Sequence, residues 1–195
     1  MTQKLDRNSL YSLEEYSQIR AEFRTRVLQH KKHRRLALGD HIMLHFEDSL
    51  TMQYQIQEML RIEKIFEAEG IQDELDAYNP LIPDGSNWKA TMLIEYPDVD
   101  ERKAALAQFA GIEHEVWMQV GGLPRVKAIA DEDMERSTDS KTSAVHFMRF
   151  ELSADMVAAL KAGDSLKAGI SNPNYNLDGV TVSELVRESL IADLD

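Results

Sequence analysis

The spacing of apolar residues changes twice within the first third of the chain, from helical to strand-like and back to helical. Apolar side chains recur at three- and four-residue spacing over residues 13–34, behind Ser12 and Glu15 in the arrangement of an N-terminal capping box. This pattern predicts an amphipathic helix. Residues 42–47 and 50–57 instead alternate apolar and polar side chains with a period of two, so we expect a β-hairpin there.

The remaining chain mixes both periods and shows no internal repeat. Helical spacing returns at Glu58, and Gly70 interrupts it. We expect further helices over residues 72–78, 98–109, 154–161 and 181–192. We expect strands over residues 89–96, 115–120, 126–130, 143–152 and 165–170. Residues 132–141 are charged and lack an apolar period, which predicts a mobile loop.

This interspersed order favours an α+β fold with a mainly antiparallel or mixed sheet, an N-terminal amphipathic helix and several packed helices. We expect a single domain over residues 1–195. A loop rich in turn-forming residues near residues 79–88 is the place where a subdivision would fall.

Composition narrows the class of protein. A chain of 195 residues can bury about 70% of its unfolded surface, so its stability requires no disulfide or metal. Hydrophobic residues make up 43% and charged residues 29%, which excludes intrinsic disorder and a collagen-like chain. The absence of cysteine excludes a disulfide framework, a thiol nucleophile, a zinc ribbon and a self-ligated iron–sulfur cluster.

The sequence also bears on location. No window approaches 18 consecutive apolar residues, so we expect no membrane helix. Residues 1–7 lack the apolar stretch of a signal peptide. We therefore expect a cytoplasmic protein.

The net charge of −12 is unevenly distributed. Residues 20–35 carry seven basic side chains against one acidic, whereas residues 58–76 carry seven acidic against two basic. An acidic chain disfavours nonspecific binding to duplex nucleic acid. A solvated helix end is the leading interpretation of the basic segment, and an acidic protein partner is the second. The candidate partner-binding residues are Lys31, Lys32, Arg34 and Arg35.

The histidines and their neighbours do not indicate a metal site. His30 and His33 lie three residues apart near a predicted helix end, but the surrounding positive charges would repel a divalent cation. His41 and His45 share a strand face about 13 Å apart, too far for one ion. The Glu113-His114-Glu115 segment is polar, and we expect it at the surface. We expect no metal and no cofactor of the chain's own.

The strand over residues 143–152 places His146 among apolar side chains on one face and Arg149 on the opposite face. A histidine in this position is typically a hydrogen-bonded core residue, with a proton-handling or ligand-binding role as the alternative. Arg149 needs a carboxylate partner, and we expect Glu95 to supply it in a structural ion pair.

Recognisable catalytic motifs are absent. The chain contains no G-x-S-x-G, G-x-x-x-x-G-K-[ST] or G-x-G-x-x-G motif. We therefore assign no catalytic residue, and enzymatic activity is the less favoured interpretation. A pocket for a small ligand or substrate would form if polar residues from several elements converge. The candidate ligand-binding residues are Glu58, Arg61, Asn79, Asp84, Glu95, His146 and Arg149.

Several short segments spread over nearly the whole chain form a recognisable combination. They are RTRV at 24–27, KKHRR at 31–35, QIQEMLR at 55–61, NPLIPDG at 79–85, KATM at 89–92 and VHF at 145–147. Together they resemble a bacterial family of uncharacterised proteins of about this length. The family has no assigned activity, so the resemblance implies no catalytic residues. It implies a setting beside rubrerythrin-like proteins and iron–sulfur oxidoreductases, in oxidative-stress or redox metabolism.

Three functions follow, in order of preference. The leading hypothesis is a non-enzymatic accessory protein that binds a redox partner, such as a rubrerythrin-like or iron–sulfur protein. The second is an enzyme or small-ligand binder that uses the candidate residues above. The third is nucleic-acid binding through the basic residues 30–35, which lack the interleaved aromatic side chains that stack on bases.

Overall fold

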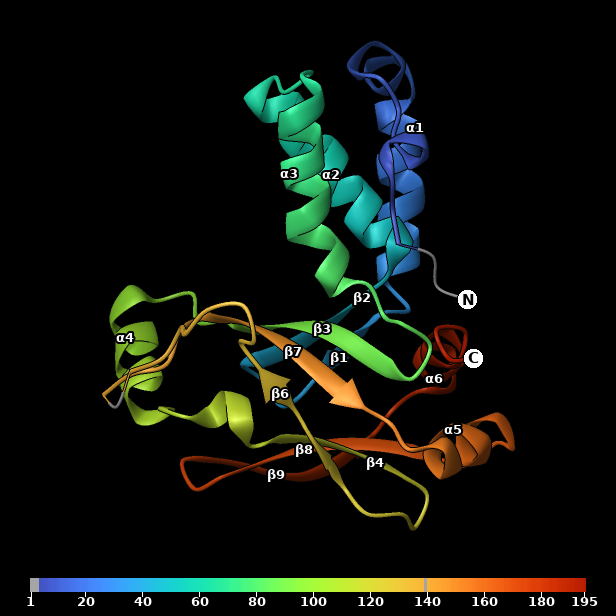
Figure 1. Cartoon of the computed structure of the whole chain (residues 1–195). Coiled ribbons are helices and arrows are strands. Elements are labelled where there is room, and N and C mark those ends of the chain that lie inside the picture. The colour runs from blue at the N-terminus through green and yellow to red at the C-terminus, as the bar shows by residue number, and fades with distance from the viewer. Residues whose placement is uncertain (1–3, 139) are drawn as a thin grey trace.

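The structure, a computed structural model, describes residues 4–138 and 140–195 (Figure 1). Residues 1–3, where we expect no signal peptide, and Asp139, which falls in the predicted loop over residues 132–141, lie outside the described residues. Among the described helices, none has both the length and the apolar character that crossing a bilayer requires.

Two antiparallel sheets form the body of the molecule, and the chain has an α+β fold as predicted (Figure 1). The first sheet runs in the order β1 (Arg35–Ala37), β2 (Ile42–Glu47), β3 (Asn87–Ile94), β7 (Val145–Glu151) and β6 (Ile129–Ala130). The second sheet runs in the order β5 (Val126–Lys127), β4 (Val116–Val120), β8 (Leu166–Asn172) and β9 (Tyr175–Thr181).

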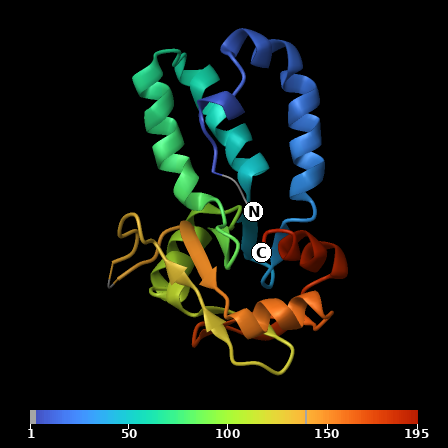
Figure 2. The same cartoon turned by 45° about the vertical axis from the view of Figure 1, so that its right-hand side comes forward.

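A helical arm stands on the side of the first sheet that faces away from the second (Figures 1 and 2). Its helices are α1 (Leu13–Lys31), α2 (Ser49–Glu63) and α3 (Ala68–Tyr78), with the 3-10 helices η1 (Arg7–Ser9) and η2 (Asn79–Leu81). Because α2 and α3 are inserted between β2 and β3, both ends of this helix pair join the first sheet. The body carries α4 (Val99–Gln108), η3 (Ile112–His114), α5 (Ala154–Lys161) and α6 (Glu184–Ile191).

The main hydrophobic core lies between the two sheets. Trp88 and Phe150 of the first sheet and Met118 and Ile170 of the second are at most 1% exposed and belong to one continuous cluster. The indole Nε1 of Trp88 donates to the backbone oxygen of Leu190 at 2.9 Å, which attaches α6 to this core. The arm has two smaller apolar clusters of its own, so its packing is separate from that of the body.

The predicted hairpin is wrong in its second half, because residues 50–57 lie within α2. Asp48 caps this helix: its carboxylate accepts from the backbone N–H of Thr51 at 2.9 Å, and the Thr51 hydroxyl accepts from the N–H of Asp48. Buried side chains then follow at helical spacing, at Met52, Ile56 and Leu60. Over a short window these residues also fit the period of two of a strand. The N-cap formed by Asp48 distinguishes the helix from the strand.

Two strands carry no clear signal in the sequence. The helix predicted over residues 13–34 ends at Lys31, and β1 follows it as a three-residue edge strand. β9 follows the turn after Asn172 and pairs with β8 through an irregular register. The predicted strand over residues 126–130 divides into β5 and β6, which pair with different sheets.

Candidate functional site

The face of the first sheet that points away from the core carries polar side chains in rows across three strands. The register places Lys89 of β3 between Glu47 of β2 and Arg149 of β7. Directly opposite residues in antiparallel strands have Cβ atoms about 5 Å apart. The three charged side chains therefore form one row.

The next row places Thr91 between His45 and Phe147. Thr91 Oγ1 donates to one carboxylate oxygen of Glu47 at 2.8 Å, and Thr51 Oγ1 donates to the other at 2.7 Å. Glu47 is 6% exposed, so this buried carboxylate is held by hydroxyl groups from β3 and α2.

Two adjoining cavities, of about 460 and 360 Å³, lie between this face and the root of the helical arm. They share Tyr78, Leu81 and Phe147 as lining residues, and we call them together the outer-face groove. The larger cavity is also lined by Ala77, Pro80, Lys89, Glu132, Asp133, Met148 and Arg149. The smaller one is also lined by Lys31, His45, Glu47, Met52, Gln55, Thr91, Leu93 and Val145.

Arg149 is a paired cation at the wall of the larger cavity. Its guanidinium donates to both oxygens of Glu132 at 2.8 Å and to Glu151 at 2.5 Å. The hydrogen bond from Arg149 lowers the pKa of Glu132. The predicted pair with Glu95 is wrong, because Glu95 follows the end of β3 whereas Arg149 lies opposite Lys89, near the start of that strand.

Lys89 differs from its neighbours. It is half-buried, and within the described part of the chain its ammonium group makes no hydrogen bond and no ion pair within 4 Å. Burial lowers the pKa of Lys89, and the positive charge of Arg149 lowers it further, against the attraction of Glu132, Asp84 and Glu151.

The smaller cavity adds two more basic groups. Burial lowers the pKa of His45, and the negative charge of Glu47 opposes that shift. Lys31, at the end of α1, has no ion pair to any described residue. The groove is therefore lined by three cations, Lys31, Lys89 and Arg149, and by three carboxylates, Glu47, Glu132 and Asp133. Each carboxylate bonds to a described residue, whereas Lys31 and Lys89 have no ion pair among the described residues.

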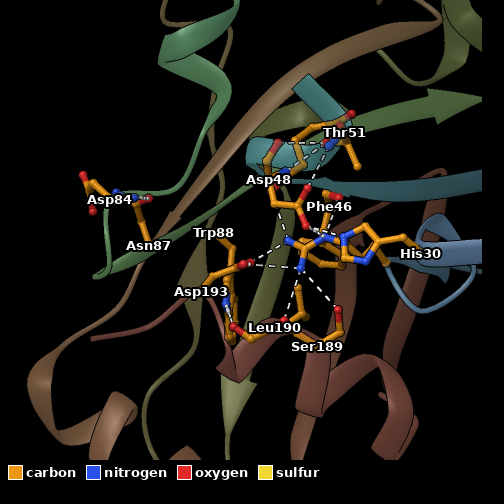
Figure 3. Close-up of polar contacts among 12 residues, drawn as sticks. His30, Phe46, Asp48, Thr51, Asp84, Asn87, Trp88, Ser189, Leu190 and Asp193 are labelled. Atoms are coloured by element: carbon orange, nitrogen blue, oxygen red, sulfur yellow. Dashed lines mark hydrogen bonds and ion pairs between the residues drawn. The ribbon is translucent and has the colours of Figure 1, made fainter. Parts of the chain in front are cut away.

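A second polar cluster joins the arm to the body, on the other side of β2 (Figure 3). Arg34 is 2% exposed and contacts Asp193 at 2.5 Å and Asp48 at 3.2 Å. His30 also contacts Asp48, at 2.5 Å. Burial alone would raise the pKa of Asp48, but the hydrogen bond from His30 and the charge of Arg34 outweigh it and lower the pKa.

These contacts correct one prediction for the basic segment. Arg34 cannot bind a partner at the surface, because its guanidinium also donates to the backbone oxygens of Phe46 and Glu47. Lys32 and Arg35 are exposed, and Lys31 is half-buried at the groove. The segment is therefore divided between a buried junction, the groove and the surface.

His146 is a fully buried, hydrogen-bonded core residue. Its Nδ1 lies 2.6 Å from a carboxylate oxygen of Asp131, and its Nε2 lies 2.8 Å from the hydroxyl of Thr142 and 3.0 Å from the backbone oxygen of Ser143. Asp131 has a left-handed backbone with φ of 54°, which a non-glycine residue adopts at some strain. These contacts fasten the start of the loop over residues 132–141 to β7.

Glu113, Asp131 and His146 place potential metal-ligating atoms within 4.8 Å of one another. The surface position predicted for Glu113 is wrong, since it is 2% exposed and accepts from Thr142 at 2.9 Å. Asp131 also accepts from Arg136 at 3.2 Å, so a cation already neutralises it. The arrangement is a hydrogen-bonded cluster whose ring nitrogens and carboxylates have protein partners.

Glu58 and Arg61 lie on the arm. Glu58 accepts from Arg20 at 2.8 Å, from Arg61 at 3.2 Å and from the hydroxyl of Tyr16 at 2.8 Å. The hydrogen bond from Arg20 is the main cause that lowers the pKa of Glu58 to about 2. The side-chain amide of Asn79 accepts from the backbone N–H of Leu5 at 2.8 Å and donates to the backbone oxygen of Leu5 at 2.9 Å.

Asp84 and Glu95 stand apart from both groups. Asp84 accepts from the N–H of Ser86 at 3.2 Å within its own turn, and Glu95 is exposed beyond the end of β3. Of the seven predicted ligand-binding residues, Arg149 lines the groove and the other six lie elsewhere.

The groove depends on residues that the sequence reasoning passed over. Apolar and polar residues alternate along β2 and β3, and His45 and Lys89 occupy polar positions of these strands. The period of two therefore predicts that both side chains point away from the apolar face of the sheet. Tyr78 and Leu81 come from the end of the arm, and no local pattern indicated that they would cover that face.

Two comparisons match this chain over nearly its whole length. A family model described as protein of unknown function (DUF3501) matches residues 4–194. A crystal structure described as a novel protein of unknown function from Burkholderia pseudomallei K96243 is similar, with a TM-score of 0.94 and 52% sequence identity. That alignment covers 99% of this chain and 100% of the other. No functionally curated protein matches.

Proposed function

This chain belongs to the DUF3501 family of proteins of unknown function, and we propose that it binds a small amphipathic anion in the outer-face groove. Ligand sites are concave and mostly apolar, with a few polar groups that orient the ligand. The groove has this character, with Phe147, Leu81 and Tyr78 as its shared walls and basic side chains on its floor.

The observation that carries the proposal is the pair of cations without ion pairs among the described residues. Lys31 and Lys89 lie in different cavities of one groove, and each is partly withdrawn from water. A cation in such a position gains most from an anion that also fills the apolar space beside it. A carboxylate joined to an aromatic or aliphatic body has both properties.

Thermal denaturation with matched ligands tests the proposal. The probes are 4-phenylbutanoate, its neutral amide and the corresponding amine. A ligand at 100 times its Kd stabilises a protein by about 2.7 kcal/mol, which is a readily measured rise in Tm. We expect the carboxylate to raise Tm more than the amide, and the amine to have no effect.

Lysine variants locate the effect. Lys89→Met and Lys31→Met should each reduce the carboxylate response, whereas Lys167→Met, at an exposed position of β8, should leave it unchanged. Equal responses to carboxylate and amide, or a carboxylate response that survives both groove variants, would contradict the proposal.

The accessory role beside a redox protein stays a prediction drawn from the family resemblance. The exposed cations Lys32 and Arg35 are the residues that support contact with an acidic partner. If that role holds, rubrerythrin-like or iron–sulfur proteins of the host co-purify with the chain, and reversing both charges removes them. Binding to nucleic acid through the same residues would instead show affinity that falls steeply with salt.

A further inference from the structure

Lys89 lies between Glu47 and Arg149 in one row across the sheet, and both of these neighbours already have hydrogen-bonding partners. Glu47 accepts hydrogen bonds from Thr51 and Thr91, and Arg149 is held by Glu132 and Glu151. The amino group of Lys89 faces the larger cavity from the middle strand of the first sheet. Its position is therefore built into the fold, while its nitrogen keeps free bonding capacity within the described part of the chain.

The surroundings of Lys89 make its ammonium group easier to deprotonate. Burial removes hydration from the ammonium, and Arg149 places a second positive charge directly across the strand pair, so the pKa of Lys89 is lowered. Glu132, Asp84 and Glu151 face the same region and oppose this shift. Two further carboxylates lie near Lys89: Glu47 is directly opposite it on β2, and Asp133 lines the same cavity. The hydrogen bonds that Arg149 donates to Glu132 raise the pKa of Arg149, so Lys89 is the member of the cationic pair that releases its proton more readily. A lysine desolvated beside another cation is activated as a nucleophile.

We propose that Lys89 forms a reversible imine with a small aldehyde or ketone that carries an anionic group and an apolar body. The inference rests on the proposed function, because the outer-face groove must first bind the carbonyl compound. The carbonyl carbon lies against Lys89 in the larger cavity, and the anionic group extends toward Lys31 and His45 in the smaller one. Phe147, which lines both cavities, contacts the apolar body between them.

The reaction balances without an oxidant or reductant. The nitrogen lone pair attacks the carbonyl carbon while the carbon–oxygen π pair moves to oxygen, and a proton transfer from nitrogen to oxygen gives a carbinolamine. The hydroxyl then takes up a proton and leaves as water, and the nitrogen loses its remaining proton. Amine and carbonyl compound become imine and water, with protons exchanged through solvent at the open side of the groove.

Reductive trapping of the wild-type protein is the decisive experiment. The probe is 4-carboxybenzaldehyde with sodium cyanoborohydride, followed by peptide mapping of all ten lysines. We expect the secondary amine to form first at Lys89 and to saturate with probe concentration. We also expect 4-(hydroxymethyl)benzoate, which has the same ring and carboxylate but no carbonyl group, to compete with the probe.

The possible outcomes distinguish imine formation at Lys89 from anion binding in the outer-face groove. If nuclear magnetic resonance shows that 4-(hydroxymethyl)benzoate binds at the groove, but the label spreads over exposed lysines without saturation, the imine is overturned and anion binding stands. If the analogue does not bind and Lys89 is not labelled, both proposals are overturned. Neither result depends on a variant that folds.

A variant and a pH profile sharpen the result. Lys89→Arg should lose the label at this position, whereas Lys167→Arg, at an exposed position of β8, should lose only its own label and retain both analogue binding and the Lys89 label. The labelling rate of Lys89 should reach half its maximum below pH 10.5, the ordinary pKa of a lysine side chain. A midpoint at or above that value would overturn the proposal.

Discussion

Arg34 and Lys89 are both basic side chains withdrawn from water, and their surroundings are opposite. Arg34 touches two carboxylates and three backbone carbonyls, which consume its donors. Lys89 has charged neighbours on both adjacent strands, yet among the described residues none pairs with it. In this fold a fully paired charge marks a junction that locks elements together. The unpaired charge of Lys89 lies instead at the groove where we propose that a ligand binds.

The largest expected effect is at the paired charge. Arg34→Met leaves Asp48 and Asp193 buried without their cation, and removing one partner of a buried pair costs about 3–5 kcal/mol. Denaturation in urea measures the loss. The exposed neighbour provides the control: Arg35→Met should change the free energy of unfolding by no more than about 0.5 kcal/mol. Similar losses in the two variants would show that the junction is not held by this charge.

The arm provides an intermediate case, in which Glu58 is paired with Arg20 and Arg61 nearer to solvent. Glu58→Gln should cost about 2 kcal/mol, because hydrogen bonds between charged groups contribute about 1.5–3 kcal/mol. The hydrogen bond from Arg20 lowers the pKa of Glu58 from 4.5 to about 2. The ionised carboxylate therefore stabilises the fold above pH 4.5, and this contribution is lost as the pH falls toward 2.

Urea denaturation at two pH values checks that sign. The difference in unfolding free energy between wild type and Glu58→Gln should be larger at pH 7 than at pH 3. The exposed Glu14 on α1 serves as the control, and Glu14→Gln should show a small difference at both pH values. A gap that widens at pH 3 would contradict the assigned ion pair.

A smaller loss of stability is expected at Glu47, the hydrogen-bonded carboxylate that lines the groove. Thr91→Val keeps the shape of the side chain but removes one of the two hydroxyl donors to Glu47, so we expect a loss of about 1 kcal/mol. Thermal unfolding measures it. Thr25→Val is the control, because the Thr25 hydroxyl bonds only within its own exposed helix turn. A loss as large for Thr25→Val would remove Glu47 as the cause.

The smallest effect on stability is expected at the unpaired charge. Lys89→Met removes a desolvated ammonium without breaking a contact among the described residues, so the free energy of unfolding should change by less than about 0.5 kcal/mol or rise. The same variant should lose its preference for carboxylate ligands. A large destabilisation would place Lys89 with Arg34 as a structural cation.

Local patterns predict local structure well in this chain. The capping box at Ser12 and Glu15 is present as expected, and the α+β class follows from the interspersed periods. The prediction fails where one signal satisfies two periods, as over residues 50–57. Asp48 and Thr51 form the capping box that distinguishes α2 from a strand.

The candidate site depends on contacts that no local pattern contains. Asp193 lies 159 residues from Arg34, so its burial could not be inferred from the basic run around it. Arg149 pairs with Glu132 because a loop returns to the strand, whereas spacing alone suggested Glu95. The face on which Lys89 lies is predictable from the alternation along β3. Its position beside Arg149 additionally requires the pairing of β3 with β7.

The connection between β2 and α2 has a consequence for selectivity. Asp48 alone separates the strand from the helix, and it is buried, capped onto Thr51 and bonded to Arg34. A joint this short and this restrained fixes α2, which lines the smaller cavity through Met52 and Gln55, relative to β2, which lines it through His45 and Glu47. Preorganised walls reduce the ordering cost of association, so the proposed ligand would have to match the existing spacing between helix and strand.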